Sequence, residues 1–208
     1  NFKRYLHIER EVENRLKQII VQSSSLNHAQ LILVCGNVGD GKSHILSYLH
    51  NEIANEIVKF QIHNDATESH NPNESSNDTL YRLLKGFKDE NIEQSNAKII
   101  LAINLGTLSK FMEEHSSEFQ KLAEFIQVQS ILDNTVVSFK DFDTDSYFHQ
   151  INFTDYHLYS LTEDGSISTT ITELLNRIIS ISESNDIFKA YEKIKDQIEF
   201  SRCPVKFN

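Results

Sequence analysis

Short apolar runs alternate with longer amphipathic segments along this chain. Residues 31–35 (LILVC) and 98–106 (KIILAINLG) are apolar almost throughout, which is typical of strands buried on both faces of a parallel sheet. The run 57–62 (IVKFQI) is predicted to be another strand. Apolar residues recur at helical spacing over 43–58 and around 108–127. This alternation predicts an α/β fold with a mostly parallel sheet and helices on both of its faces.

Further helices and strands are expected before, between and after these segments. Residues 1–21 and 185–200 carry amphipathic patterns, so each is predicted to form a helix. Asp78 is expected to cap a helix that runs to Phe87. Strands are predicted in TVVSF (135–139) and in HQINFTDYHLYSL (149–161), and LTEDGSISTTITELLNRII (161–179) is predicted to form a turn and an N-capped helix.

The organisation of the chain is expected to have three parts. These are an N-terminal lead-in helix (1–28), a core (29–162) and a helical segment (163–208) that continues into a further C-terminal region. The 208 residues suffice for one α/β domain with its own core. The sequence starts without methionine and stops abruptly after CPVKFN, so we expect it to be a piece of a longer protein.

Three of the six glycines fall within six positions, in GNVGDGKS (36–43). This stretch matches G-x-x-x-x-G-K-[ST] at every fixed position, follows a predicted strand and opens a predicted helix, which is the context of a P-loop. Glycines allow the backbone to wrap so that successive N–H groups converge on phosphate oxygens. The start of the helix adds unpaired N–H groups and the positive end of its dipole. The sequence therefore predicts a three-layer P-loop NTPase fold.

The motif assigns roles to its residues. Lys42 would contact the β- and γ-phosphates, and Ser43 would bind Mg²⁺ through its hydroxyl. Two alternatives stay open: a glycine-rich turn with an exposed lysine, and a loop that binds nucleotide without hydrolysing it. No N-K-x-D-type guanine-reading motif follows a strand, so ATP is favoured over GTP. The candidate nucleotide-binding residues are Gly36, Asn37, Val38, Gly39, Asp40, Gly41, Lys42, Ser43 and His44.

Hydrolysis also needs a carboxylate near Mg²⁺ and a group that orients the attacking water. Asp65 follows the apolar strand 57–62 and Glu68 comes three residues later, so Asp65 is the candidate metal ligand and Glu68 the candidate water-polarising residue. The alternative is an Asx-type turn with a solvated Glu68. The strand before Asp65 follows the first helix directly, so either the topology is abbreviated or another acid faces the metal.

Asn104, at the end of an otherwise apolar strand, is a third catalytic candidate. An amide in that position is costly unless it has partners. We expect Asn104 to sense the γ-phosphate and to help hold the lytic water. The alternative is an amide that ties two neighbouring loops together.

Charge and composition limit the partners. Lys and Arg number 20 against 30 Asp and Glu, a net charge of −10, whereas a protein that grips phosphate backbones over its whole surface is usually basic. No apolar run approaches the ~20 residues that cross a bilayer, and no signal peptide is visible. Cys35, in a predicted buried strand, and Cys203 do not suggest a disulfide framework. We therefore expect a cytoplasmic protein without a membrane partner.

Other polar clusters are weaker candidates. DFDTDSYFHQ (141–150) lacks the glycine and the distal glutamate of a Ca²⁺ loop. Potential zinc ligands match no zinc spacing; they include His44, His50, His63, His70 and Cys203. Any arginine could stabilise charge in a neighbouring subunit of a homo-oligomer, and the sequence does not choose among Arg4, Arg10, Arg15, Arg82, Arg177 and Arg202.

Five stretches together resemble a known family. CGNVGDGKSHIL (35–46), HNDATESHNP (63–72) and IILAINLGTL (99–108), with INFTDYHLYSL (151–161) and CPVKFN (203–208), resemble the F component of bacterial DNA phosphorothioation-dependent restriction systems (DptF). The P-loop is generic to NTPases, and the NDATES and AINLG stretches are the family-specific part. The resemblance spans most of the chain.

The resemblance implies a cytoplasmic ATPase that works with other restriction-complex proteins against DNA lacking the protective sulfur modification. It matches residues 36–43 to the nucleotide loop, Asp65 and Glu68 to an acidic stretch, and Asn104 to a sensor-like strand. DNA contact is expected in partners or in a missing C-terminal region. Two alternatives are a non-catalytic, nucleotide-gated scaffold and a small-molecule or nucleoside kinase, although no arginine-rich lid is visible.

Overall fold

The computed structural model describes residues 2–64, 75–132, 141–163 and 165–196. The chain divides into two compact units, residues 11–156 and residues 1–10 with 157–208. The expected boundaries at 28/29 and 162/163 stay a prediction of domain organisation, and each compact unit is described by itself. The predicted strand at 135–139 lies outside the described residues.

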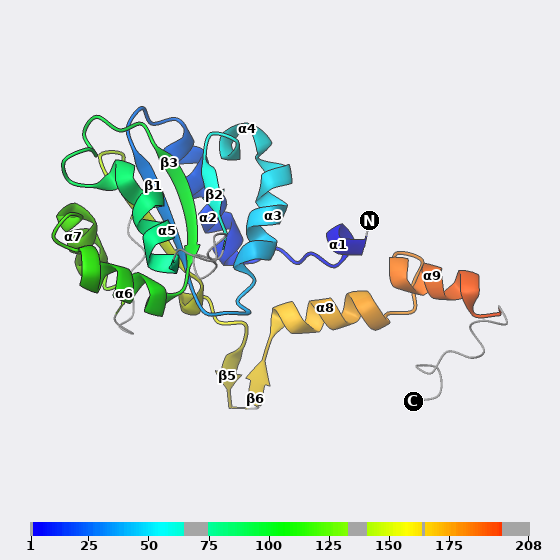
Figure 1. The fold of residues 1–208 in the computed structure, drawn as a ribbon. Coiled ribbons are helices and arrows are strands. Elements are labelled where there is room, and N and C mark those ends of the chain that lie inside the picture. Colours follow the sequence, from blue (N-terminus) through cyan, green and yellow to red (C-terminus); the bar gives the residue numbers. More distant parts are fainter. Residues whose placement is uncertain (1, 65–74, 133–140, 164, 197–208) are drawn as a thin grey trace. The chain divides into compact units, whose positions relative to one another are not determined.

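The larger unit is built on a four-stranded parallel sheet. Its strands are β1 (Gln30–Cys35), β2 (Gln61–His63), β3 (Lys98–Ile103) and β4 (Phe148–Asn152), in the order β2-β3-β1-β4. All pairings are parallel. Figure 1 shows β3 running between β1 and β2, so the second strand of the chain does not pair with the first.

Helices cover both faces of this sheet, as the apolar runs of β1 and β3 require. Alternate side chains of a strand point to opposite faces, and all six residues of β1 are buried. Leu31 and Leu33 pack in one core cluster, whereas Ile32 and Val34 pack in the other. The first cluster includes side chains from α5 (Ser76–Leu83), α6 (Leu105–His115) and α7 (Gln120–Val128); the second includes side chains from α2 (Glu11–Ser24), α3 (Lys42–Glu52) and α4 (Ala54–Ile57) (Figure 1). The predicted α/β class, with a mostly parallel sheet between helices, is confirmed, and the P-loop NTPase assignment stays a prediction.

Two predicted helices are each interrupted at a buried residue. The segment 43–58 forms α3 and α4, which meet at Ile53, and the segment 108–127 forms α6 and α7, with Phe119 before α7. Ile53 and Phe119 have non-helical torsions (φ −122°, ψ 48° and φ −128°, ψ 47°) and are buried. Periodicity did not reveal these breaks, because each break buries an apolar residue and needs no proline or glycine.

The helix that was predicted to begin at Asp78 is α5, and its N-cap lies three residues earlier, at Ser75. Ser75 caps α5, since its Oγ accepts a hydrogen bond from the N–H of Asp78 at 3.1 Å. The Asp78 carboxylate accepts in return from the N–H of Ser75 at 3.0 Å, which makes a capping box. The Ser75 hydroxyl also donates to this carboxylate at 2.6 Å, and this bond, together with the one from the Ser75 N–H, holds the pKa of Asp78 below its usual value. Helix α5 is followed by a 3₁₀ turn, η1 (Leu84–Phe87).

The smaller unit contains a hairpin and three helices in its described part. Strands β5 (Ser160–Thr162) and β6 (Gly165–Ile167) pair antiparallel, and α8 (Thr169–Ile179) and α9 (Asp186–Ile194) follow. Ser168 and Asn185 cap these two helices. The expected helix at 1–21 is two helices: α1 (Phe2–Tyr5) belongs to the smaller unit, whereas α2 belongs to the larger one.

Arg177 ties α1 to α8 within this smaller unit. Its Nη1 donates to the carbonyl oxygen of Tyr5 at 2.8 Å, and the Tyr5 hydroxyl donates to the carbonyl of Arg177 at 2.8 Å.

Across the described part of the chain, no helix has the length and apolar character that a membrane span requires.

Candidate phosphate-binding site

The glycine loop lies where β1 gives way to α3. Strand β1 ends at Cys35, and Gly41 immediately precedes α3, which begins at Lys42. Gly36, Gly39 and Gly41 all have positive φ angles (149°, 93° and 89°). A Cβ on Gly36 would lie 2.7 Å from Asp40 Oδ2 and 2.9 Å from the Cβ of Phe153, so only glycine fits there. The predicted succession of strand, glycine-rich loop and helix is confirmed, and its identity as a P-loop stays a prediction.

A pocket of about 280 Å³ opens beside this loop. Because β1, β2 and β3 are parallel neighbours, their carboxyl ends meet at one edge of the sheet. The described residues that line the pocket come from the loop, from α3 and from the ends of β2 and β3: Val38, Gly39, Gly41, Lys42, Ser43, His44, Asn64, Ala102, Ile103 and Asn104. None of these described residues is an Asp or Glu. In a chain of net charge −10, this local composition favours an anion.

Lys42 lies against the loop that precedes it. Its ammonium donates to the carbonyl oxygens of Gly36 at 2.9 Å and Asn37 at 2.6 Å. An ammonium has three N–H donors, so one donor is left for a ligand in the pocket. These two hydrogen bonds hold the positive charge of Lys42 at the wall of the pocket. Its contact with phosphates stays a prediction.

Three of the predicted binding residues lie in the loop but do not line the pocket. They are Gly36, Asn37 and Asp40. The carboxylate of Asp40 accepts a hydrogen bond from the N–H of Asn37 at 2.5 Å, so this N–H already has a partner inside the loop. Asp40 therefore stabilises the loop conformation.

Asn64 is a pocket residue that the sequence interpretation missed. It directly follows β2, and its Oδ1 lies 3.0 Å from Ser43 Oγ, which donates to it. The sequence interpretation chose the next residue, Asp65, because it carries a charge. Asp65 and Glu68 lie outside the described residues. The strand predicted at 57–62 is in fact Gln61–His63, because Ile57 belongs to α4, and Asn64 is the residue that directly follows it.

Asn104 lines the pocket and also caps α6. Its Oδ1 accepts from the N–H of Thr107 at 2.8 Å, so the hydrogen bond that the structure shows is local and does not join two loops. No hydrogen bond from Asn104 Nδ2 to another described residue is seen. The amide oxygen is therefore used by the helix while the amide N–H groups remain as donors. The sensor role stays a prediction.

The strand order explains how these side chains meet. Strand β3, which leads into Asn104, lies between β1, which leads into the glycine loop, and β2, which leads into Asn64. The two alternatives raised by the sequence, an abbreviated topology or another acid on the metal side, both stay predictions, because Asp65 lies outside the described residues. The next strand in the chain need not be the next strand in the sheet.

Cys35, directly before the loop, is a core residue as expected. It is fully buried, and burial raises the pKa of its thiol to about 12. The thiol is therefore protonated at neutral pH and is not a nucleophile.

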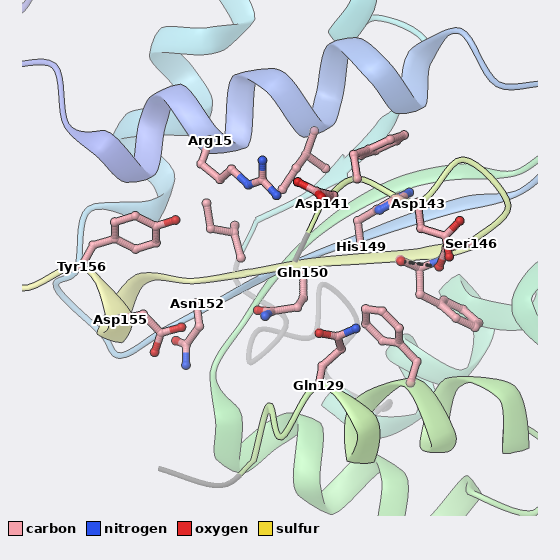
Figure 2. A pocket seen from close by; sticks show the side chains of 15 residues that line it. Arg15, Gln129, Asp141, Asp143, Ser146, His149, Gln150, Asn152, Asp155 and Tyr156 are labelled. Carbon is pink, nitrogen blue, oxygen red and sulfur yellow. Dashed lines mark hydrogen bonds between the residues drawn. The ribbon is translucent and has the colours of Figure 1, made fainter. Parts of the chain in front are cut away.

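A second pocket of about 170 Å³ lies beside β4, and none of the predicted site residues lines it. Figure 2 shows Arg15 approaching from α2 on one side of β4 and Gln129 from the end of α7 on the other. His149 and Gln150, neighbours on β4, point to opposite sides of the strand. The wall carries one arginine together with Asp141, Asp143 and Asp155.

His149 forms a closed hydrogen-bond chain in this wall. The Gln30 amide donates through Nε2 to the carbonyl oxygens of Ala29 at 2.8 Å and Ser146 at 3.1 Å, so its Oε1 faces His149 Nε2 at 3.0 Å and accepts from it. The Phe142 ring stacks on the imidazole, with 4.3 Å between centroids. Burial lowers the pKa of His149 to about 4. His149 is therefore a neutral side chain that joins β4 to β1 and to the preceding loop.

No family model, curated protein or solved structure matches this chain. Within the described residues, no group of three or more His, Cys, Asp or Glu side chains could hold a metal ion. The resemblance to the restriction component and the magnesium assignment therefore both stay predictions.

Proposed function

We propose that this chain binds ATP through residues 36–44 and hydrolyses it. The observation that carries the proposal is the pocket beside the glycine loop, where Lys42 and Ser43 meet the ends of β2 and β3 without a carboxylate among the described lining residues. A triphosphate needs converging donors and positive charge. The loop, the start of α3 and the Lys42 ammonium offer both.

Mg²⁺ fits the oxygen donors on the pocket wall, because it prefers oxygen ligands and is usually bound together with substrate phosphates. Ser43 and a residue that follows β2 would hold it, and the bound metal would neutralise charge that develops on the phosphates. The donor groups of Asn104 would contact the γ-phosphate and orient water. Asp65 and Glu68 are the sequence-based candidates for the acidic groups of hydrolysis.

The biological setting that we propose is a phosphorothioation-dependent DNA restriction complex of the cytoplasm. This part of the proposal is supported by the sequence resemblance alone. The net charge of −10 favours DNA contact through partner proteins or through a further region of the protein.

A nucleotide-gated scaffold is the second candidate. The observation that favours it is the neutral lining of the described pocket, which offers amides but no carboxylate for hydrolysis. Such a protein would change partners on ATP binding without releasing phosphate.

Lys42→Ala tests the proposal. Loss of a charge-assisted contact worth about 1.5–3 kcal/mol should weaken ATP binding by roughly 10- to 100-fold in calorimetry. Lys110→Ala, which removes an exposed lysine of α6, is the matched control and should bind normally. Unchanged affinity in Lys42→Ala would contradict the phosphate-binding role.

Phosphate release separates the two candidates. Wild type and Lys42→Ala would be compared with and without DNA and partner subunits. Release by wild type alone, or on addition of these components, supports the ATPase; tight ATP binding without any release supports the scaffold. Transfer of phosphate to an added nucleoside would point to a kinase instead.

A further inference from the structure

The hydrogen bond between Ser43 and Asn64 orients the hydroxyl that the P-loop motif assigns to the metal. Ser43 Oγ donates to Asn64 Oδ1 at 3.0 Å, so the lone pairs of the hydroxyl oxygen point away from Asn64. Both side chains are exposed and line the same pocket. Among the described residues, the side chain against this hydroxyl is thus an amide.

We propose that Asn64 is the positioning residue on the metal side of this site, and that the site recognises Mg²⁺ only as its complex with the nucleotide. The inference rests on the proposed function, since it needs ATP in the pocket. P-loop NTPases commonly hold Mg²⁺ with the loop Ser or Thr and an Asp from a neighbouring strand. Here the residue in hydrogen-bond contact with the loop serine is neutral.

The charge of the pocket explains this selectivity. The described wall offers Mg²⁺ one neutral oxygen ligand, the Ser43 hydroxyl that Asn64 orients, and the only described lining residues that carry or can acquire charge are Lys42 and His44. A free divalent cation gains little there and is repelled by Lys42. The phosphates of ATP neutralise Lys42 and supply the anionic ligands that Mg²⁺ prefers. The protein therefore adds orientation, through Asn64 and Ser43, and the nucleotide adds charge.

The experiment measures the metal directly and without turnover. Mn²⁺, a paramagnetic substitute for Mg²⁺, is titrated into the full chain by electron paramagnetic resonance, with and without a non-hydrolysable ATP analogue. Affinity for the analogue is measured separately in EDTA. The variants are Asn64→Ala, Asn64→Asp, Ser43→Ala, the double variant Ser43→Ala/Asn64→Ala and Asp65→Asn. Ser117→Ala, at an exposed serine between α6 and α7, is the matched control.

Wild type should bind Mn²⁺ only in the presence of the analogue. Asn64→Ala should weaken Mn²⁺ in the ternary complex by about 2- to 10-fold, the range of one hydrogen bond, and leave analogue affinity in EDTA unchanged. Asn64→Asp should tighten Mn²⁺ by at least about tenfold and give measurable Mn²⁺ binding without nucleotide. Ser43→Ala/Asn64→Ala should be no weaker than Ser43→Ala, because Asn64 acts through Ser43.

Two results would overturn the inference while leaving ATP binding intact. One is normal Mn²⁺ affinity in Asn64→Ala together with a large loss in Asp65→Asn, which would make the aspartate the metal-side residue. The other is Mn²⁺ binding by wild type without nucleotide. Failure of wild type to bind the analogue, in EDTA or with Mn²⁺, would instead overturn the proposed function itself.

Discussion

The two polar pockets of the larger unit lie on the same sheet but use their polar groups differently. Beside β4, His149 and Gln30 satisfy each other and two backbone carbonyls, and the imidazole is buried. Gln150 Oε1, on the other side of the strand, is buried and has no hydrogen-bond partner among the described residues. Beside the glycine loop, Ser43 and Asn64 are exposed and Asn104 keeps amide donors that no described residue uses. Ser43, Asn64 and Asn104 are therefore accessible to a ligand, whereas the hydrogen bonds of His149 and Gln30 are used inside the protein.

The two pockets also differ in the charged residues that line them. The described wall beside the loop has Lys42 and no carboxylate, whereas the wall beside β4 mixes Arg15 with three aspartates. An anion such as a triphosphate fits the first wall. The second wall has three aspartates against one arginine, so it does not favour an anion.

The largest expected effect concerns acid stability and His149. The folded-state pKa of about 4 lies below the ordinary value of 6.5, so the unfolded chain binds this proton more readily. His149 thus contributes stability that is present above pH 6.5 and is lost as pH falls toward 4, by about 3 kcal/mol in total. Denaturant unfolding of wild type and His149→Gln at several pH values measures this difference.

His149→Gln should have a shallower dependence of unfolding free energy on pH between 6.5 and 4, whatever its absolute stability. His50→Gln, at an exposed position of α3, serves as the control and should keep the wild-type slope. If the unfolding free energies of wild type and His149→Gln had the same pH dependence, His149 would not be a buried neutral side chain that stabilises the fold. The contrast between the two pockets would then be weaker.

The next effect concerns the backbone of the glycine loop, beside the first of these pockets. Gly36→Ala should destabilise the protein by about 1–3 kcal/mol, because its φ of 149° is unfavourable for alanine and the new Cβ would overlap Asp40 and Phe153. Gly39→Ala is the comparison, since its φ is also positive but a Cβ there meets no atom within 4 Å. Thermal unfolding should rank Gly36→Ala below Gly39→Ala, and the reverse order would contradict the packing argument.

The smallest effect on stability distinguishes two roles of Asn104. Asn104→Ala should lose about 1 kcal/mol of unfolding free energy with the cap of α6, and should slow turnover while sparing ATP binding. Asn104→Asp keeps an acceptor for Thr107 but removes the amide donors. It should therefore unfold like wild type and still turn over slowly. Normal turnover in Asn104→Asp would reject the sensor role and leave Asn104 as a cap alone.

Much of the fold could be predicted because burial acts on local sequence. The continuous apolar runs of β1 and β3 required a sheet covered on both faces, and the structure has one. The cap of α5 was misplaced because Ser75 and Asp78 are both good cap residues and only the backbone geometry chooses between them. The breaks at Ile53 and Phe119 escaped because a buried apolar residue preserves the periodic pattern even where the helix changes direction.

By itself, the sequence determined the glycine loop and its lysine and serine, because that local motif carries its own backbone requirements. Only the tertiary structure decided which strand ends surround the loop. Placing β3 between β1 and β2 brought Asn104 and Asn64 to the pocket, although 21 positions separate Ser43 from Asn64. The carboxyl ends of parallel strands lie at one edge of the sheet. Which ends are neighbours there depends on how the whole sheet packs, and no local sequence pattern indicates it.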